Sequence, residues 1–175
     1  AAGLGCEWNF PVETSYKPYA HCRVLHALAD VLIEIMRTHG LRPEEIEGIR
    51  VWVEGMVERP IWLNRDIQDV MDAQFSIAHG IALAAHCPPT ARAWQDPALV
   101  FRPSVLALMD KVTHEVHPDY VKLLTGHGGS RAVTLRVREY DSGDSGGITG
   151  NGCTGCGGGL AEGGDECQDD DRHGA

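Results

Sequence analysis

Residues 16–30 have the sequence YKPYAHCRVLHALAD, the clearest structural signal in the chain. Pro18 disfavours helical backbone at Lys17, the residue before it. We expect the helix to start after this point, near Cys22, and to continue to His39. Gly40 then supplies the left-handed residue that commonly ends a helix. Apolar residues recur along this helix at spacings of three and four, at Val24, Leu25, Leu28, Val31, Leu32 and Ile35. The pattern predicts an amphipathic helix that packs one face against a core.

The opposite face of the same helix carries polar side chains. At 100° per residue, Arg23, His26 and Asp30 fall within an arc of about 60°. With Lys17 just before the helix, two cations and an imidazole lie near backbone N–H groups that favour an anion. The same residues would also make ordinary surface pairs at spacings of three and four. The residues alone therefore leave open either a carboxylate site or a solvated helix face.

The pattern in the rest of the chain predicts an α+β domain. Alternation of apolar and polar residues over 49–53 and 133–137 is typical of strands with one buried face, and residues 113–117 suit a short strand. We expect further helical segments at residues 43–45, over 69–86, and from Asp96 and Pro103 onward, with a loop over 55–68. These elements favour a small, mainly antiparallel sheet with helices packed on one face.

The character of the sequence changes after Tyr140. Residues 141–175 contain twelve glycines, and eight acidic residues there accompany a single arginine. A segment with so few large apolar side chains cannot offset its ordering entropy. We therefore expect an α+β domain over residues 1–140 and a Gly/Asp-rich disordered tail over 141–175. The richness of the tail in glycine, aspartate and cysteine resembles the product of translating a GC-rich gene in a shifted reading frame. The nucleotide sequence would test this hypothesis.

Composition limits the possible functions. The net charge is −10 and the basic residues are not clustered, which argues against nucleic acid as a partner. No apolar run approaches the roughly 20 residues that a membrane helix needs. Cys6, Cys22 and Cys87 are scattered along the chain, which is typical of free thiols in a reducing compartment. We therefore expect a cytoplasmic protein that binds neither a membrane nor nucleic acid.

One cysteine pair has metal-ligand spacing. Cys153 and Cys156 are separated by two residues, and Cys167 and His173 follow. A structural zinc site needs four ligands on a chain that folds around the ion. Because the second pair lacks such spacing and glycine surrounds the first, we expect no metal and no other cofactor.

Several groups of residues occur in an order and spacing that are specific together. They are Leu4-Gly5 with Trp8, then Tyr16-Lys17-Pro18-Tyr19 with Cys22-Arg23 and His26, then Gly40-Leu41 with Pro43-Glu44-Glu45-Ile46-Glu47, then Asp72-Ala73-Gln74-Phe75-Ser76-Ile77, and the segment around Val112. In this arrangement the sequence resembles the MmgE/PrpD family over roughly residues 4–140. The family includes 2-methylcitrate dehydratase, cis-aconitate decarboxylase and iminodisuccinate epimerase.

The resemblance implies a particular place in a larger enzyme. In this family a helical domain, built from both ends of the chain, carries a smaller α+β lid, and the active site lies between the two. This sequence is similar to the lid alone. The implied partners are a small polycarboxylate substrate and the helical domain, which supplies further acid–base residues, and the implied full-length protein is a homodimer.

The resemblance also implies site residues. Lys17 and Arg23 match cations that face the substrate carboxylates, and His26 matches an active-site histidine. In Phe75-Ser76-Ile77-Ala78-His79 the histidine replaces the tyrosine of the family's Phe-Ser-x-Pro-Tyr motif. Imidazole exchanges protons near neutral pH, so His79 is a second catalytic candidate, and the reaction stays open among dehydration, decarboxylation and epimerisation. The alternatives are a buried helical histidine for His79 and an exposed loop lysine for Lys17.

The chemistry that the resemblance implies is cofactor-free proton abstraction next to a carboxylate, with cations stabilising the charge that develops. Two alternatives of another class remain open. One is a non-catalytic module that binds small acids, or an inactive truncated fragment. The other is a metal-binding protein centred on the cysteine-containing tail.

Overall fold

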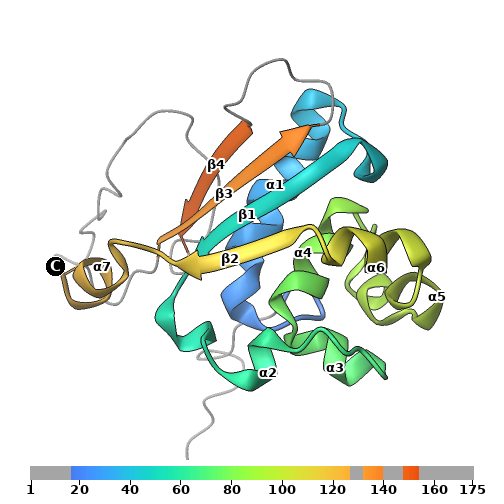
Figure 1. The fold of residues 1–175 in the computed structure, drawn as a ribbon, viewed down its shortest axis with the longest axis horizontal. Helices are drawn as coiled ribbons and strands as arrows, with labels where there is room; N and C mark the ends of the chain where they lie inside the picture. The colour runs from blue at the N-terminus through green and yellow to red at the C-terminus, as the bar shows by residue number, and fades with distance from the viewer. Residues whose placement is uncertain (1–16, 127–131, 140–147, 154–175) are drawn as a thin grey trace, which may run out of the picture.

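The computed structural model describes residues 17–126, 132–139 and 148–153, and the structural statements below refer to these residues. The helices are α1 (His26–His39), α2 (Pro60–Leu63), α3 (Val70–Phe75), α4 (Ile77–Ala85), α5 (Pro97–Val100), α6 (Pro103–Met109) and α7 (Tyr120–Gly126). The strands are β1 (Ile46–Val53), β2 (Val112–Val116), β3 (Ala132–Glu139) and β4 (Ile148–Cys153) (Figure 1). Short 3₁₀ turns are η1 (Arg23–Leu25), η2 (Pro43–Glu45), η3 (Gly55–Val57) and η4 (Ala91–Gln95).

The strands form one mixed sheet in the order β2-β1-β3-β4. β1 pairs with β2 in parallel, whereas the β1–β3 and β3–β4 pairs are antiparallel. A parallel pair needs a long crossover connection, and the chain between β1 and β2 provides it with α2 to α6. The α+β class and the mainly antiparallel sheet predicted from the sequence are confirmed.

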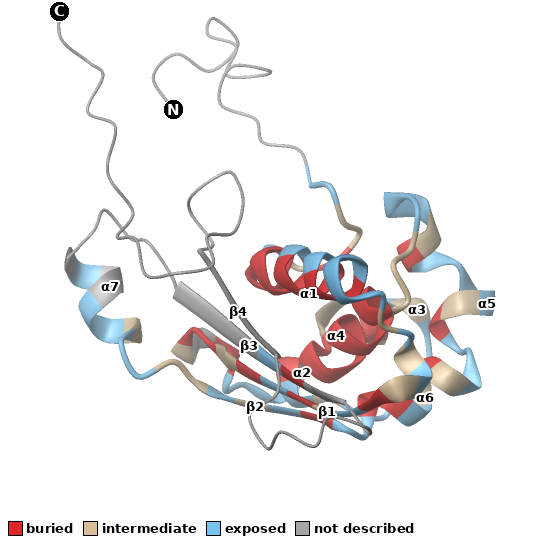
Figure 2. Ribbon diagram, turned by 90° about the horizontal axis from the view of Figure 1, so that it is seen from above, coloured by how far each residue is buried: buried red, intermediate tan, exposed pale blue. Residues whose placement is uncertain are grey.

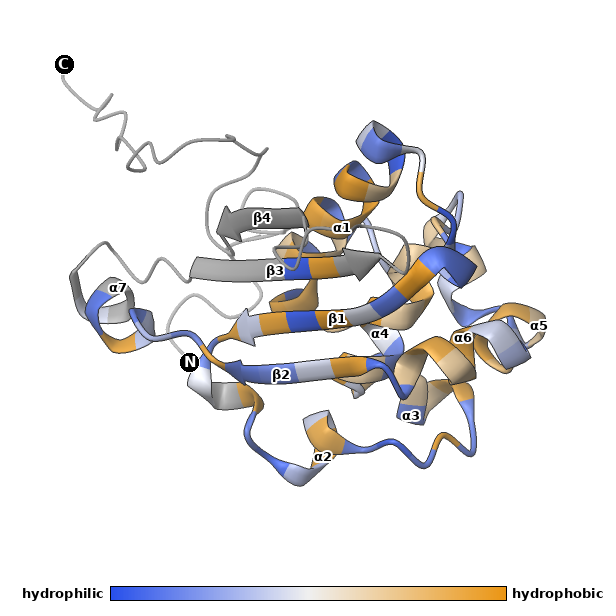
Figure 3. Ribbon diagram, turned by 45° about the horizontal axis from the view of Figure 1, so that its top comes forward, coloured by the Kyte–Doolittle hydropathy of each residue, from blue (hydrophilic) through white to orange (hydrophobic). Residues whose placement is uncertain are grey.

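Helices cover one face of this sheet. α1 contacts β3 and β4, α4 contacts β2, and the two helices contact each other on the same side of the sheet (Figure 2). Along β1 the side chains of Ile49, Val51 and Val53 are buried toward the helices, while Arg50 on the other face is exposed. Figure 3 looks onto that other face, with the strands in front of α1 and α4. The one-sided helical packing predicted from the alternation is confirmed.

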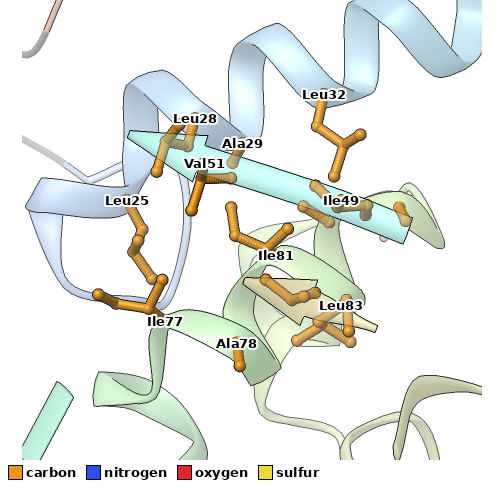
Figure 4. Packing of buried hydrophobic residues seen from close by; sticks show 14 of the residues in the cluster. Leu25, Leu28, Ala29, Leu32, Ile49, Val51, Ile77, Ala78, Ile81 and Leu83 are labelled. Atoms are coloured by element: carbon orange, nitrogen blue, oxygen red, sulfur yellow. The ribbon is translucent and has the colours of Figure 1, made fainter. Parts of the chain in front are cut away.

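The core lies between α1, β1 and α4. Figure 4 shows side chains from the three elements facing one another, among them Leu28 and Leu32 of α1, Val51 of β1 and Ile81 of α4. All four side chains are fully buried. Burying a leucine or isoleucine side chain stabilises the folded state by about 1.5–3 kcal/mol relative to leaving it exposed, so this cluster is the main source of the domain's stability.

The first helix follows its sequence pattern closely. η1 leads directly into α1, whose apolar stripe is buried from Leu28 through Ile35. Gly40 has φ 64° and its N–H bonds to the Met36 carbonyl, which ends the helix as predicted. The expected turn at residues 43–45 is η2, with Pro43 in its first position.

The predicted single helix over residues 69–86 is wrong at one residue. Ser76 has extended backbone (ψ 118°), which separates α3 from α4. Its hydroxyl accepts a hydrogen bond from the His79 N–H at 3.2 Å, and the Asp69 carboxylate caps α3 in the same way. Serine and aspartate compete with helical backbone through such capping bonds, which apolar periodicity does not reveal.

Two other segments also carry more structure than the sequence indicates. η3 and α2 lie within residues 55–68, which were expected to form a loop. Residues 148–153 lie in the segment predicted to be disordered, and the structure instead pairs them with β3 as β4. A strand ladder forms through backbone groups, so it tolerates a segment with few apolar side chains. The rest of the tail, and the residues before Lys17, lie outside the described residues.

No helix among the described residues is long and apolar enough to cross a bilayer.

Candidate functional site

The candidate site is organised by residues 17–22, which we call the strap. The strap lies against the junction of α3 and α4, because the Cys22 N–H donates to the Gln74 carbonyl at 3.2 Å. The His21 ring adds a second bond there, from Nε2 to the Ala73 carbonyl at 2.9 Å. These bonds attach the chain entering η1 to a part of the fold about fifty residues later in the sequence.

His21 is buried as a neutral ring. The Cys22 N–H donates to Nδ1 at 2.8 Å, so Nδ1 is the acceptor and Nε2 carries the hydrogen that bonds Ala73. Burial lowers the pKa of His21 to about 3, and the neighbouring His79 and His26 rings act in the same direction. His21 therefore stays uncharged at neutral pH and lies within electrostatic reach of both other histidines.

Tyr19 is the part of the strap that covers α1. Its ring meets the His26 ring edge-on, with centroids 5.3 Å apart, and packs against Trp94 at 4.9 Å. Its hydroxyl donates a hydrogen bond to the Asp30 carboxylate. Burial and this bond raise the pKa of Tyr19 above its ordinary value. Asp30 therefore holds the strap, in addition to its place on the polar face of α1.

His26 is less exposed than the helical pattern indicates. Only 9% of its surface is accessible, and its Nε2 bonds to the His21 carbonyl at 3.2 Å. Burial lowers the pKa of His26, and the nearby charges of Lys17 and Arg23 lower it further. The sequence places His26 on a polar arc with Arg23 and Asp30, but the cover supplied by Tyr19 comes from tertiary packing.

Lys17 and Arg23 are the exposed cations of the site. Both act on the His26 ring through space, so the structure brings these three predicted residues together. Among residues 17–126, neither cation makes one of the ion pairs found, which join Arg42 to Glu45 and Arg50 to Glu115. The two charges are therefore available to an anion at the strap.

His79, the remaining predicted residue, lies deeper. Its side chain has no exposed surface, and its Nε2 bonds to the Val100 carbonyl at 2.9 Å. Nδ1 is buried with no hydrogen-bond partner among the described residues, as is Nε1 of Trp94. Burial lowers the pKa of His79. Because the His79 ring is fully buried, exchange of a proton with a surface-bound acid would require α4 or the Val100 region to move.

No group of three or more His, Cys, Asp or Glu side chains within the described ranges could hold a metal ion. Of the tail residues considered under the metal-binding alternative, Cys156, Cys167 and His173 lie outside those ranges. The described part of the site consists of two cations, histidines, aromatic rings and the Asp30 carboxylate that bonds Tyr19.

Comparison with known families decides the classification. The model of the MmgE/PrpD C-terminal domain matches residues 19–144, which is most of the chain. The chain belongs to the MmgE/PrpD family. A search of curated proteins finds no significant match.

The MmgE/PrpD match contains three of the four residues predicted for the site. Arg23, His26 and His79 fall within it, whereas Lys17 precedes its first residue, Tyr19. The family predicted from the sequence motifs is confirmed, and the roles of the four residues remain proposals.

Sequence reasoning missed two residues that organise this MmgE/PrpD site. His21 is fully enclosed, and Tyr19 covers His26, but neither follows a periodic pattern that would signal burial. Both lie in the stretch YKPYAHCRVLHALAD, in the irregular residues before the helix. Their roles depend on contacts with Ala73 and Trp94, which are distant in sequence.

Proposed function

We propose that this chain forms the lid side of the active site of a cofactor-free lyase or isomerase that acts on a small polycarboxylic acid. The reaction proposed is proton abstraction next to a carboxylate, followed by dehydration, decarboxylation or epimerisation. The observation that carries the proposal is the pair of exposed cations, Lys17 and Arg23, beside the buried imidazole of His26.

The charges suit this chemistry. Removing a proton next to a carboxylate spreads negative charge onto that carboxylate, and fixed cations stabilise the charge as it develops. Arg23 offers a planar guanidinium for two parallel bonds to one carboxylate, and Lys17 offers a compact charge for another. A substrate with two or more carboxylates would use both.

His26 is proposed as the proton acceptor or donor on this side. Because burial and the two cations lower its pKa, the ring is neutral near pH 7 and can accept a proton. Tyr19 covers the ring, so direct contact between His26 and a substrate requires Tyr19 to move aside. His79 is the second candidate, and a proton would reach its fully buried ring only when α4 or the Val100 region moves.

The proposal includes a second half of the site. The family match concerns a C-terminal domain, which supports a helical domain of the same enzyme as the partner that closes the site. A homodimer of the whole enzyme belongs to the same proposal. The free thiols of Cys22 and Cys87 support a reducing, cytoplasmic setting.

Calorimetric titration of the chain with citrate tests the binding part of the proposal. Replacing Lys17 or Arg23 with alanine should each weaken citrate binding about tenfold to a hundredfold, the range for one hydrogen bond to a charged group. Lys122→Ala, an exposed lysine on α7, is the matched control and should leave affinity unchanged. Equal affinities for all variants, or no binding by the wild-type protein, would contradict the proposal.

A further assay separates catalysis from binding alone. The chain mixed with a helical domain of the family should dehydrate or epimerise a polycarboxylate, and His26→Ala should remove that activity. Citrate binding without activity on any polycarboxylate would favour the non-catalytic module.

A further inference from the structure

One residue of the strap makes three hydrogen bonds that join three parts of the site. The His21 ring donates from Nε2 to the Ala73 carbonyl at 2.9 Å and accepts at Nδ1 from the Cys22 N–H at 2.8 Å. Its main-chain carbonyl lies 3.2 Å from Nε2 of His26. His21 thus connects the strap, the α3–α4 junction and the start of α1.

The fold leaves space for the His21 ring in one position. Gly80 of α4 lies directly against it: a Cβ there would be 2.5 Å from Nε2 and 2.9 Å from both Cδ2 and Cε1. Trp94 approaches the ring edge-on, with centroids 6.2 Å apart. Because the ring is enclosed, it has no flexible end that could yield to a larger residue at position 80.

The bond to His26 also selects a tautomer. A carbonyl oxygen only accepts, so the hydrogen of the neutral His26 ring must be on Nε2. The lone pair then lies on Nδ1, which becomes the nitrogen that can take up a proton.

We propose that His21 is a positioning residue that clamps the strap to the α3–α4 junction, sets the places of Lys17 and Arg23 relative to His26, and makes Nδ1 the basic nitrogen of His26. The inference rests on the proposed function, because it assumes that an acid binds at the strap. It adds that the geometry of this acid site depends on a buried residue that does not touch the acid.

Gly80→Ala tests the clamp without altering any charged or hydrogen-bonding side chain. The new methyl group must displace the His21 ring, and we expect citrate affinity to fall about tenfold, as for the loss of one charged contact. Gly40→Ala is the matched control. It makes the same substitution at φ 64°, where a side chain strains the backbone but meets nothing within 4 Å, at the far end of α1.

A merely structural role predicts that both glycine variants lose affinity in proportion to their loss of stability. The clamp predicts weaker citrate binding in Gly80→Ala alone, and unchanged affinity in that folded variant would overturn it. If Gly80→Ala does not fold, His21→Gln serves instead. Its amide keeps a donor for Ala73 but lacks the ring acceptor for Cys22, so the same loss of affinity is expected.

Long-range ¹H–¹⁵N spectra of the histidine side chains test the clamp without any acid. In the wild-type protein near pH 7.5, His21 and His26 should both carry their hydrogen on Nε2, and Gly80→Ala should disturb both signals. A His26 ring protonated at Nδ1 would overturn the inference. If the wild-type protein binds no citrate, the proposed function fails. The spectra then still test whether His21 fixes the tautomer of His26.

Discussion

Lowering the pH from 8 to 5 should destabilise the fold through His21, whose ring is buried and neutral. Its pKa is about 3 in the folded chain, against an ordinary value of 6.5. At a pH between 3 and 6.5, the His21 ring binds a proton in the unfolded chain but not in the folded chain. The contribution of His21 to the free energy of unfolding is therefore fully present above pH 6.5 and is lost progressively as the pH drops toward 3.

The size of the effect follows from the interval. A solution at pH 5 is about 1.5 pH units below the pKa of the ring in the unfolded chain, while the ring in the folded chain is still neutral. The free energy of unfolding therefore falls by about 2 kcal/mol. His26 and His79 also have lowered pKa values and add losses of the same sign. The carboxylates with lowered pKa, Glu45 and Glu115, titrate below this window, so the interval from pH 8 to 5 reports histidines.

Urea unfolding at pH 8 and pH 5, followed by tryptophan fluorescence, measures this loss. In His21→Leu the difference between the two pH values should shrink by about 2 kcal/mol, whatever the variant's absolute stability. An undiminished difference would refute the assignment to His21. As a direct check, the wild-type His21 ring signals in NMR should stay unchanged from pH 8 to pH 5.

Three further outcomes are expected. Leu32→Ala should cost about 2–5 kcal/mol in urea unfolding because Leu32 is fully buried in the core, whereas Glu34→Ala on the exposed face of α1 should change little; similar losses would contradict the core assignment. Ser76→Ala should cost about 1–2 kcal/mol by removing the cap of α4, and an unchanged midpoint would show that the cap is unimportant. Asp30→Asn should lower the raised pKa of Tyr19 in an NMR titration, since a neutral partner no longer opposes the phenolate; a constant pKa would mean that burial alone raises it.

Local patterns were sufficient for much of the fold. The spacing of Leu28, Leu32 and their neighbours located α1, and the left-handed Gly40 marked its end, because both signals act within a few residues. Alternation located β1 and β3 for the same reason. The family followed from motifs whose order is kept over most of the chain.

Features that depend on distant contacts were missed. Ser76 divides the helix predicted over residues 69–86 because its hydroxyl caps α4, and β4 forms because β3 offers it a backbone edge. At the site, helical geometry correctly grouped Arg23 with His26, but Tyr19 buries the His26 ring through packing with Trp94. His79 is fully buried in α4, as in the alternative of a buried helical histidine, but its bond to the distant Val100 carbonyl follows no local pattern.

The location of a bound acid shows directly whether the strap and the start of α1 hold a polycarboxylate. Two-dimensional ¹H–¹⁵N spectra of the chain, recorded during titration with citrate, would map it residue by residue. We expect saturable amide shifts concentrated in residues 17–30, reduced together in Lys17→Ala and Arg23→Ala. Shifts confined to the open face of the sheet around Arg50, or no saturable shift at all, would show that the strap does not bind the acid.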